Sequence, residues 1–133
     1  KDYMDKTIKF CRKSGYVNNI FGRRSYISGI NDKNYNIRNF QERAAINAPI
    51  QGSAAEIMRL AMIRLSNKIK NIKIKMLLQI HDELIFEVPN NDVKNLSEII
   101  KEEMISVKDS DLHSFSTPLT VDINTGDNWG ILH

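Results

Sequence analysis

Apolar positions recur along this chain with two different periods, and these periods predict most of its secondary structure. A step of four over residues 53–70 is typical of a helix with one buried stripe. The members of that stripe are Ile57, Ala61, Leu65 and Ile69. Steps of three and four over residues 91–107 predict a second amphipathic helix. Residues 5–12 are typical of the end of a basic helix, which Gly15 would terminate because glycine accepts a left-handed conformation.

A first antiparallel hairpin is expected near the beginning of the chain. Residues 16–18 and 25–27 flank a turn that contains Gly22, a residue favoured in tight turns. The same hairpin carries Arg23 and Arg24.

A second hairpin is expected from residues 73–80 and 84–88, which are two β-compatible apolar runs. Only His81, Asp82 and Glu83 separate these runs, so three ionisable side chains are expected at the tip. Because two strands hold such a tip in place, it is a suitable position for chemistry.

Pro49 predicts an interruption in the helical region before the second hairpin. Its ring disfavours helical geometry at the preceding residue, so residues 42–47 are expected to form a short helix of their own. A new helix is then expected to begin near Ser53, where Glu56 would complete a capping box.

A last strand is expected over residues 119–123, opened by Pro118. Hairpins, amphipathic helices and this further strand together predict an α+β fold with antiparallel pairing.

Charge divides the chain into two unlike halves. Residues 1–75 contain 16 Lys+Arg and 5 Asp+Glu, a net charge of +11, and residues 76–133 contain 3 and 11, a net charge of −8. A basic half is the usual mark of a polyanionic partner, and an acidic half suits divalent metal; alternatively, the halves only pack together or face solvent. Cys11 is the single cysteine, and no apolar run approaches the roughly 18 residues of a membrane span. We therefore expect a reducing compartment and no membrane partner.

The tip of the second hairpin offers ligands for a hard cation. Asp82 and Glu83, beside His81, suit Mg²⁺ or Mn²⁺, which prefer oxygen donors. Neighbours on a strand point to opposite faces, so the two carboxylates are not expected to hold one ion symmetrically. One carboxylate pair is also too few for a two-metal site. A charged turn without any metal would explain the same residues.

A second candidate site is a polar helical face formed by Arg43, Asn47 and Gln51, which are spaced by four. Their side chains are donors that suit the minor-groove acceptors, N3 of purines and O2 of pyrimidines. Those acceptors lie at nearly the same place in every base pair, so such a face would check the shape of a pair without reading sequence. The alternative is a polar stripe that is hydrogen-bonded to neighbouring loops.

Four segments resemble, in the same order, the C-terminal third of the polymerase domain of family A DNA polymerases. They are GYVNNIFGRRSYI, ERAAINAPIQGSAAEIMRLAM, LLQIHDELIFEVP and PLTVDINTGDNW. The resemblance extends over about residues 1–129, and QIHDELIFEV is similar to the third catalytic motif of the family.

The resemblance implies a role for each candidate residue. Asp82 would be the metal-binding aspartate, which with a partner aspartate elsewhere holds two Mg²⁺ ions, or Mn²⁺ in their place. Glu83 would support catalysis nearer the primer, and His81 would approach the primer terminus. The residues that would contact primer and template in the minor groove are Arg43, Asn47 and Gln51.

The resemblance also implies a division of the chain. Residues 1–41 would be the end of the fingers, where Arg23 and Arg24 would make structural contacts or contacts between fingers and palm. Residues 42–133 would be part of the palm, with an antiparallel catalytic hairpin flanked by amphipathic helices. The family's first catalytic motif, which carries the partner aspartate, is not found in this sequence. We therefore expect a C-terminal fragment of a DNA-directed DNA polymerase that is inactive alone. The open edge of its hairpin is expected to favour self-association or partial unfolding.

The implied partners are primer-template DNA and deoxynucleoside triphosphates. The expected location is the bacterial cytoplasm, at the nucleoid, or an organelle if the source is not bacterial.

Two other functions remain open at this point. A non-catalytic duplex DNA-binding module would use the basic half, and its binding would survive Asp82→Ala. A stand-alone metal-dependent hydrolase would use the hairpin tip, but it needs further ligands that the sequence does not supply.

Overall fold

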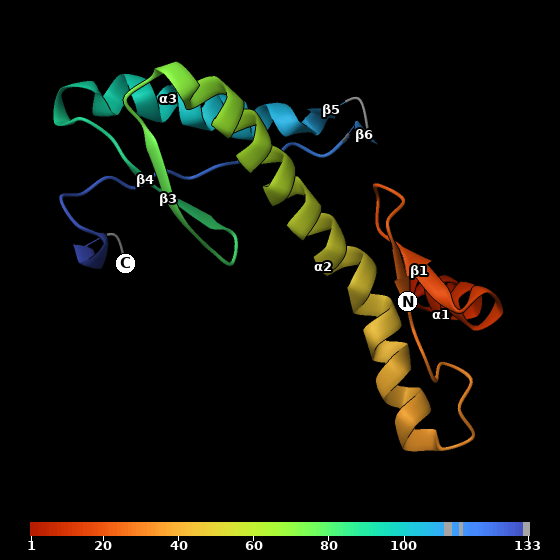
Figure 1. Cartoon of the computed structure of the whole chain (residues 1–133). Coiled ribbons are helices and arrows are strands. Elements are labelled where there is room, and N and C mark those ends of the chain that lie inside the picture. Colours follow the sequence, from red (N-terminus) through yellow and green to blue (C-terminus); the bar gives the residue numbers. More distant parts are fainter. Residues whose placement is uncertain (111–112, 115, 132–133) are drawn as a thin grey trace. The chain divides into compact units, whose positions relative to one another are not determined.

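The computed structural model describes residues 1–110, 113–114 and 116–131 of the chain. These residues form two compact units, Lys1–Glu56 and Ile57–His133, and each unit has a hydrophobic core of its own. The long helix α2 (Tyr35–Lys68) begins in the first unit and ends in the second (Figure 1). The predicted boundary between fingers and palm, at residues 41 and 42, lies inside α2 and stays a prediction.

The first unit combines a helix, a small hairpin and the first part of α2. Its elements before α2 are α1 (Asp2–Ser14), β1 (Tyr16–Asn18) and β2 (Arg24–Tyr26). As predicted, α1 ends at Gly15, which has a φ of 79° and donates its N–H to the Cys11 carbonyl. The predicted hairpin is confirmed, with Val17 opposite Ser25. The core contains Cys11, Val17, Ile27, Ile30 and Ala45, and burial raises the pKa of the Cys11 thiol.

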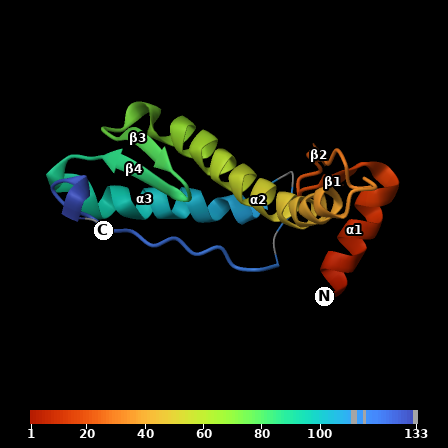
Figure 2. The same cartoon turned by 90° about the horizontal axis from the view of Figure 1, so that it is seen from below.

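The second unit packs a hairpin and a helix against the end of α2. Its elements after α2 are η1 (Ile69–Asn71), β3 (Lys75–Ile80), β4 (Glu83–Glu87), η2 (Asn90–Asp92), α3 (Val93–Ile105), η3 (Ser106–Lys108), β5 (Asp109–Ser110), β6 (His113–Ser114) and η4 (Trp129–Ile131). The predicted stripes meet in one core, to which α2 contributes Leu65 and α3 contributes Leu96 and Ile100. Figures 1 and 2 both show the β3–β4 hairpin beside α3.

Polar contacts join α2 to α3 and to η3, which directly follows it. The Arg64 guanidinium donates to the Ser106 carbonyl and hydroxyl, at 2.5 Å and 2.7 Å. The Lys68 ammonium lies 3.3 Å from the Glu103 carboxylate. These contacts stabilise the packing of the elements that share a core with the hairpin.

The predicted interruption at Pro49 is wrong, because α2 runs through this residue as one helix. A proline removes its own N–H from the helical ladder and costs about 3 kcal/mol in a helix interior. Residues on both sides of Pro49 pack into cores, among them Ala45 before it and Leu65 after it, and this burial offsets the cost. The predicted capping box is also wrong, since Ser53 lies inside the helix and its hydroxyl donates to the Pro49 carbonyl.

The predicted strand at residues 119–123 is wrong as well, because the described residues after 114 contain no strand. A strand is defined by its hydrogen-bonded neighbour, and the β3–β4 sheet consists of those two strands. The coarser prediction is confirmed, since the described chain combines helices with small antiparallel sheets. No helix in the described part is long and apolar enough to cross a bilayer.

Candidate functional site

The tip of the β3–β4 hairpin is tighter than predicted. Ile80 pairs with Glu83, so only His81 and Asp82 form the turn, and Glu83 is the first residue of β4. Turns of two residues commonly require a positive φ, and His81 has a φ of 51°. Histidine adopts this conformation more readily than most residues other than glycine. All three ionisable side chains are exposed.

Core packing of β4 and an ion pair at the open end of the hairpin support its turn. Leu84 and Phe86 point into the core of the second unit, and the alternation of a strand then directs Glu83 to the opposite face. At the open end, Lys75 Nζ lies 2.6 Å from the Glu87 carboxylate, whose hydrogen bond raises the pKa of Lys75. The hairpin therefore presents Asp82 at a supported, solvent-accessible turn.

The donor chemistry of this tip suits Mg²⁺, but the ligand set is incomplete. Carboxylate oxygens are the donors that this ion prefers, and Asp82 supplies them at an exposed position. Among the described residues, no group of three or more His, Cys, Asp or Glu side chains could hold a metal ion. Further ligands would have to come from outside the described part of the chain.

The second candidate site is an open groove of about 530 Å³ along α2. Arg43, Asn47 and Gln51 line it and are exposed. Because α2 continues through Pro49, the spacing of four puts all three on one helical face. Their side chains make no hydrogen bond to any described residue, so the alternative of a stripe bonded to loops is not observed there. The other residues that line the groove are Ile27, Phe40, Ala44 and Ala48.

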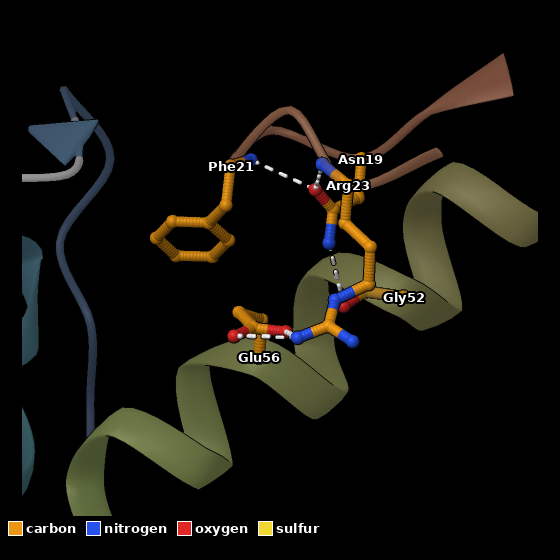
Figure 3. Close-up of polar contacts among 5 residues, drawn as sticks. All are labelled: Asn19, Phe21, Arg23, Gly52 and Glu56. Carbon is orange, nitrogen blue, oxygen red and sulfur yellow. Dashed lines mark hydrogen bonds and ion pairs between the residues drawn. The ribbon is translucent and has the colours of Figure 1, made fainter. Parts of the chain in front are cut away.

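The turn of the first hairpin is fixed to α2 directly beyond Gln51 (Figure 3). Asn19 Oδ1 accepts the N–H groups of Phe21 and Arg23 at 3.0 Å and 2.9 Å, and Asn19 Nδ2 donates to the Gly52 carbonyl at 3.2 Å. The Arg23 guanidinium lies 3.0 Å from the Glu56 carboxylate. This network fixes the hairpin turn to α2, and no local sequence pattern indicated it.

Arg24 has a different contact, with its guanidinium 4.6 Å from the centre of the Tyr16 ring. Both arginines of the first hairpin therefore make contacts within the first unit, and whether either contact joins fingers to palm stays a prediction.

Asn19→Ala is expected to lower the free energy of unfolding by about 2 kcal/mol. Asn19 is only 8% exposed, and its loss would leave two N–H groups of the turn without the acceptor Oδ1 and would remove the side-chain bond that joins the turn to the Gly52 carbonyl. Urea denaturation followed by circular dichroism measures the change. Asn18→Ala is the matched control, since Asn18 is exposed, and it should stay within about 0.5 kcal/mol. Equal effects of the two variants would contradict the assigned role of Asn19.

The two candidate sites lie in different units, the groove in the first and the hairpin tip in the second. The guanidinium and amide groups of the helical face are donors of the kind that can bond to base edges. Comparison with known sequences gives the family. The chain belongs to DNA polymerase family A, whose sequence profile matches residues 1–131.

Individual relatives agree with this assignment. The chain is 44% identical over 131 residues to DNA polymerase I of Caldicellulosiruptor bescii, and this match covers 97% of the chain and 15% of the relative. It is 41% identical to DNA polymerase I of Bacillus subtilis, with coverage of 97% and 14%. The chain thus spans about one seventh of the length of these relatives.

A solved structure gives the same result. It is the POL domain of Pol1 from M. smegmatis in complex with DNA primer-template and dNTP. The TM-score is 0.76 at 41% sequence identity, and the match covers 80% of this chain and 19% of that one.

Proposed function

We propose that this chain supplies part of the active site of a DNA-directed DNA polymerase. Asp82 is the metal-binding carboxylate, and the face of Arg43, Asn47 and Gln51 contacts primer-template DNA. The observation that carries the proposal is the Ile80–Glu83 pairing, which leaves an exposed aspartate at a two-residue turn in a chain of this family.

The reaction is in-line attack of the primer 3′-hydroxyl on the α-phosphate of a deoxynucleoside triphosphate, with pyrophosphate as the leaving group. Divalent ions, when bound, lower the pKa of the attacking hydroxyl and neutralise charge on the leaving group. Asp82 offers its carboxylate to these ions. His81 lies beside it and contacts the primer terminus, whereas Glu83, on the other face of β4, has a supporting role.

The helical face suits the minor groove in both dimensions and chemistry. Residues four apart in a helix are about 6 Å apart along its axis, so the three donors extend over about 12 Å, or three to four base pairs. Gln51 and Asn47 offer amide N–H groups and Arg43 a guanidinium. The unit that carries them contains ten Lys+Arg and five Asp+Glu, a net charge of +5, which favours a polyanionic partner.

We further assign residues 1–41 to the end of the fingers and residues 42–133 to the palm. The order of the family's motifs along the chain supports this assignment, and the partners are then primer-template DNA and deoxynucleoside triphosphates.

Primer extension tests the proposal. The 133-residue chain alone is expected not to extend a primer, because its described residues contain no complete metal site. Activity is expected when the chain is combined with a separately produced segment of Bacillus subtilis DNA polymerase I that lacks the matched region. Each part alone and a mixture without Mg²⁺ serve as controls. Extension by this chain alone would contradict the proposed division of the site.

The isolated chain is also expected to self-associate. The β3–β4 sheet has two strands, and Leu77 and Leu78 on β3 are 50% and 51% exposed. Unpaired edges beside exposed apolar residues favour pairing with a second chain. Light scattering at increasing concentration should give a mass above 15.3 kDa. Replacing both leucines with lysine should restore the monomer, and a constant monomeric mass of the unmodified chain would contradict the expectation.

A further inference from the structure

Phe40 extends the face formed by Arg43, Asn47 and Gln51, called here the DNA-contact face, by one helical turn. It is 61% exposed and lines the same groove as Arg43, Asn47 and Gln51. Phe40 lies three residues before Arg43 and seven before Asn47, the spacings that keep side chains on one face of a helix. A large, mostly exposed aromatic side chain therefore lies at one end of the row of hydrogen-bond donors that we propose to contact DNA.

The Phe40 ring has no partner of its own kind within the described residues. Tyr35, the other exposed aromatic residue at the start of α2, holds the Arg38 guanidinium 5.6 Å from its ring centre. Phe40 takes part in no ring–ring or cation–ring contact with the residues that the structure describes. Its flat surface is thus available to a ligand.

The chemistry of a phenyl ring limits the kind of ligand group that it can bind. The ring has no hydrogen-bond donor, so it cannot use the minor-groove acceptors that suit Arg43 and Asn47. It gains free energy by stacking on another flat ring, and the bases of a duplex are already stacked on each other. A free base surface occurs where the duplex ends, and aromatic side chains in a basic groove bind unpaired bases in this way.

The spacing along α2 agrees with such a contact. Phe40 precedes Arg43 by three residues, or about 4.5 Å along the helix axis. That distance is close to the 3.4 Å between successive stacked bases, so Phe40 would meet the next nucleotide beyond the one that Arg43 contacts. The net charge of +5 on this unit favours the phosphates of that nucleotide.

We propose that Phe40 stacks on an unpaired template base next to the end of the primer-template duplex. The proposal rests on the proposed function of the Arg43, Asn47 and Gln51 face, and it adds a contact to the single-stranded part of the same substrate.

A fluorescent base tests the proposal. The template carries 2-aminopurine at the first unpaired position, and the 133-residue chain is titrated into the primer-template at low salt. Stacking should quench the fluorescence. Phe40→Ala is expected to abolish the quench and to weaken binding about tenfold, from the usual strength of stacking on one base. Phe40→Tyr, which keeps a ring, should preserve both.

Two controls separate the possible outcomes. Tyr35→Ala removes an exposed ring from the same helix and should leave the quench and the affinity unchanged. Asn47→Ala should weaken binding but keep the quench at saturation. If Asn47→Ala weakens binding and Phe40→Ala changes neither readout, only the stacking proposal falls. If neither variant alters the affinity, or the unmodified chain does not bind, the proposed DNA-contact face falls with it.

Discussion

Asp82→Ala is expected to lower the rate of nucleotide incorporation at least about 10³-fold in the polymerase reassembled from this chain and the Bacillus subtilis segment. A carboxylate that holds catalytic metal contributes several kcal/mol to stabilisation of the transition state, and each 1.4 kcal/mol is a factor of ten. Single-turnover primer extension at saturating nucleotide measures the rate. Because Asp82 is exposed and its turn is held by Leu84 and Phe86, the variant should fold normally.

Matched carboxylate variants make this test specific. Asp122→Ala removes an exposed carboxylate from the same unit, in a groove that residues of α3 also line, and should leave the rate unchanged. Glu83→Ala should have a smaller effect than Asp82→Ala, because Glu83 lies in β4 rather than in the turn. Affinity for primer-template, measured by fluorescence anisotropy, should be nearly the same for all of these variants. A rate for Asp82→Ala within tenfold of the unmodified chain would exclude Asp82 as an essential metal ligand.

The elements that the sequence predicted correctly are those determined by neighbouring residues. Gly15 ends α1 through its own backbone conformation, the first hairpin follows from a turn that contains Gly22, and the second follows from two short apolar runs. The stripe of α2 and the stripe of α3 were predicted because a helix needs one buried face, and Leu65, Leu96 and Ile100 do meet in one core.

The wrong predictions concern places where contacts with residues distant in the sequence determine the secondary structure. Pro49 disfavours a helix locally, but Ala45 and Leu65 on either side are buried in cores that keep α2 continuous. Residues 119–123 have a strand-like composition, yet a strand forms only with a hydrogen-bonded neighbour.

In the candidate sites too, features set by neighbouring residues were predicted and features set by distant contacts were not. The acidic tip was predicted from its local pattern, whereas Glu83 was placed in the turn because the pairing register is not readable from composition. The position of Phe40 in the groove was not predicted because the helix was expected to begin at residue 42, whereas α2 begins at Tyr35 and puts Phe40 three residues before Arg43 on the same helix. The contacts of Asn19 and Arg23 with Gly52 and Glu56 join residues 33 apart, so no local signal predicts them.

Leu65→Ala is expected to lower the free energy of unfolding by about 3 kcal/mol, the usual cost of removing a buried leucine side chain. Leu65 is fully buried, with 0% exposure, in the core that also receives Leu84 and Phe86 of the hairpin. The melting temperature should fall by roughly 10 °C. Ile63→Ala is the matched control on the same helix, because Ile63 is 51% exposed, and it should change the unfolding free energy by less than about 1 kcal/mol.

Leu65→Ala and Asp82→Ala together separate support of the hairpin from chemistry at its tip. Leu65→Ala should reduce polymerase activity in proportion to the unfolded fraction, so cooling should restore much of the activity. Asp82→Ala should leave the melting temperature unchanged and stay inactive at every temperature. If Asp82→Ala lowered the melting temperature as much as Leu65→Ala, the loss of activity would reflect unfolding, and Asp82 would be a structural residue of the turn. If Leu65→Ala left stability unchanged, the core beneath the hairpin would not be what holds the tip in place.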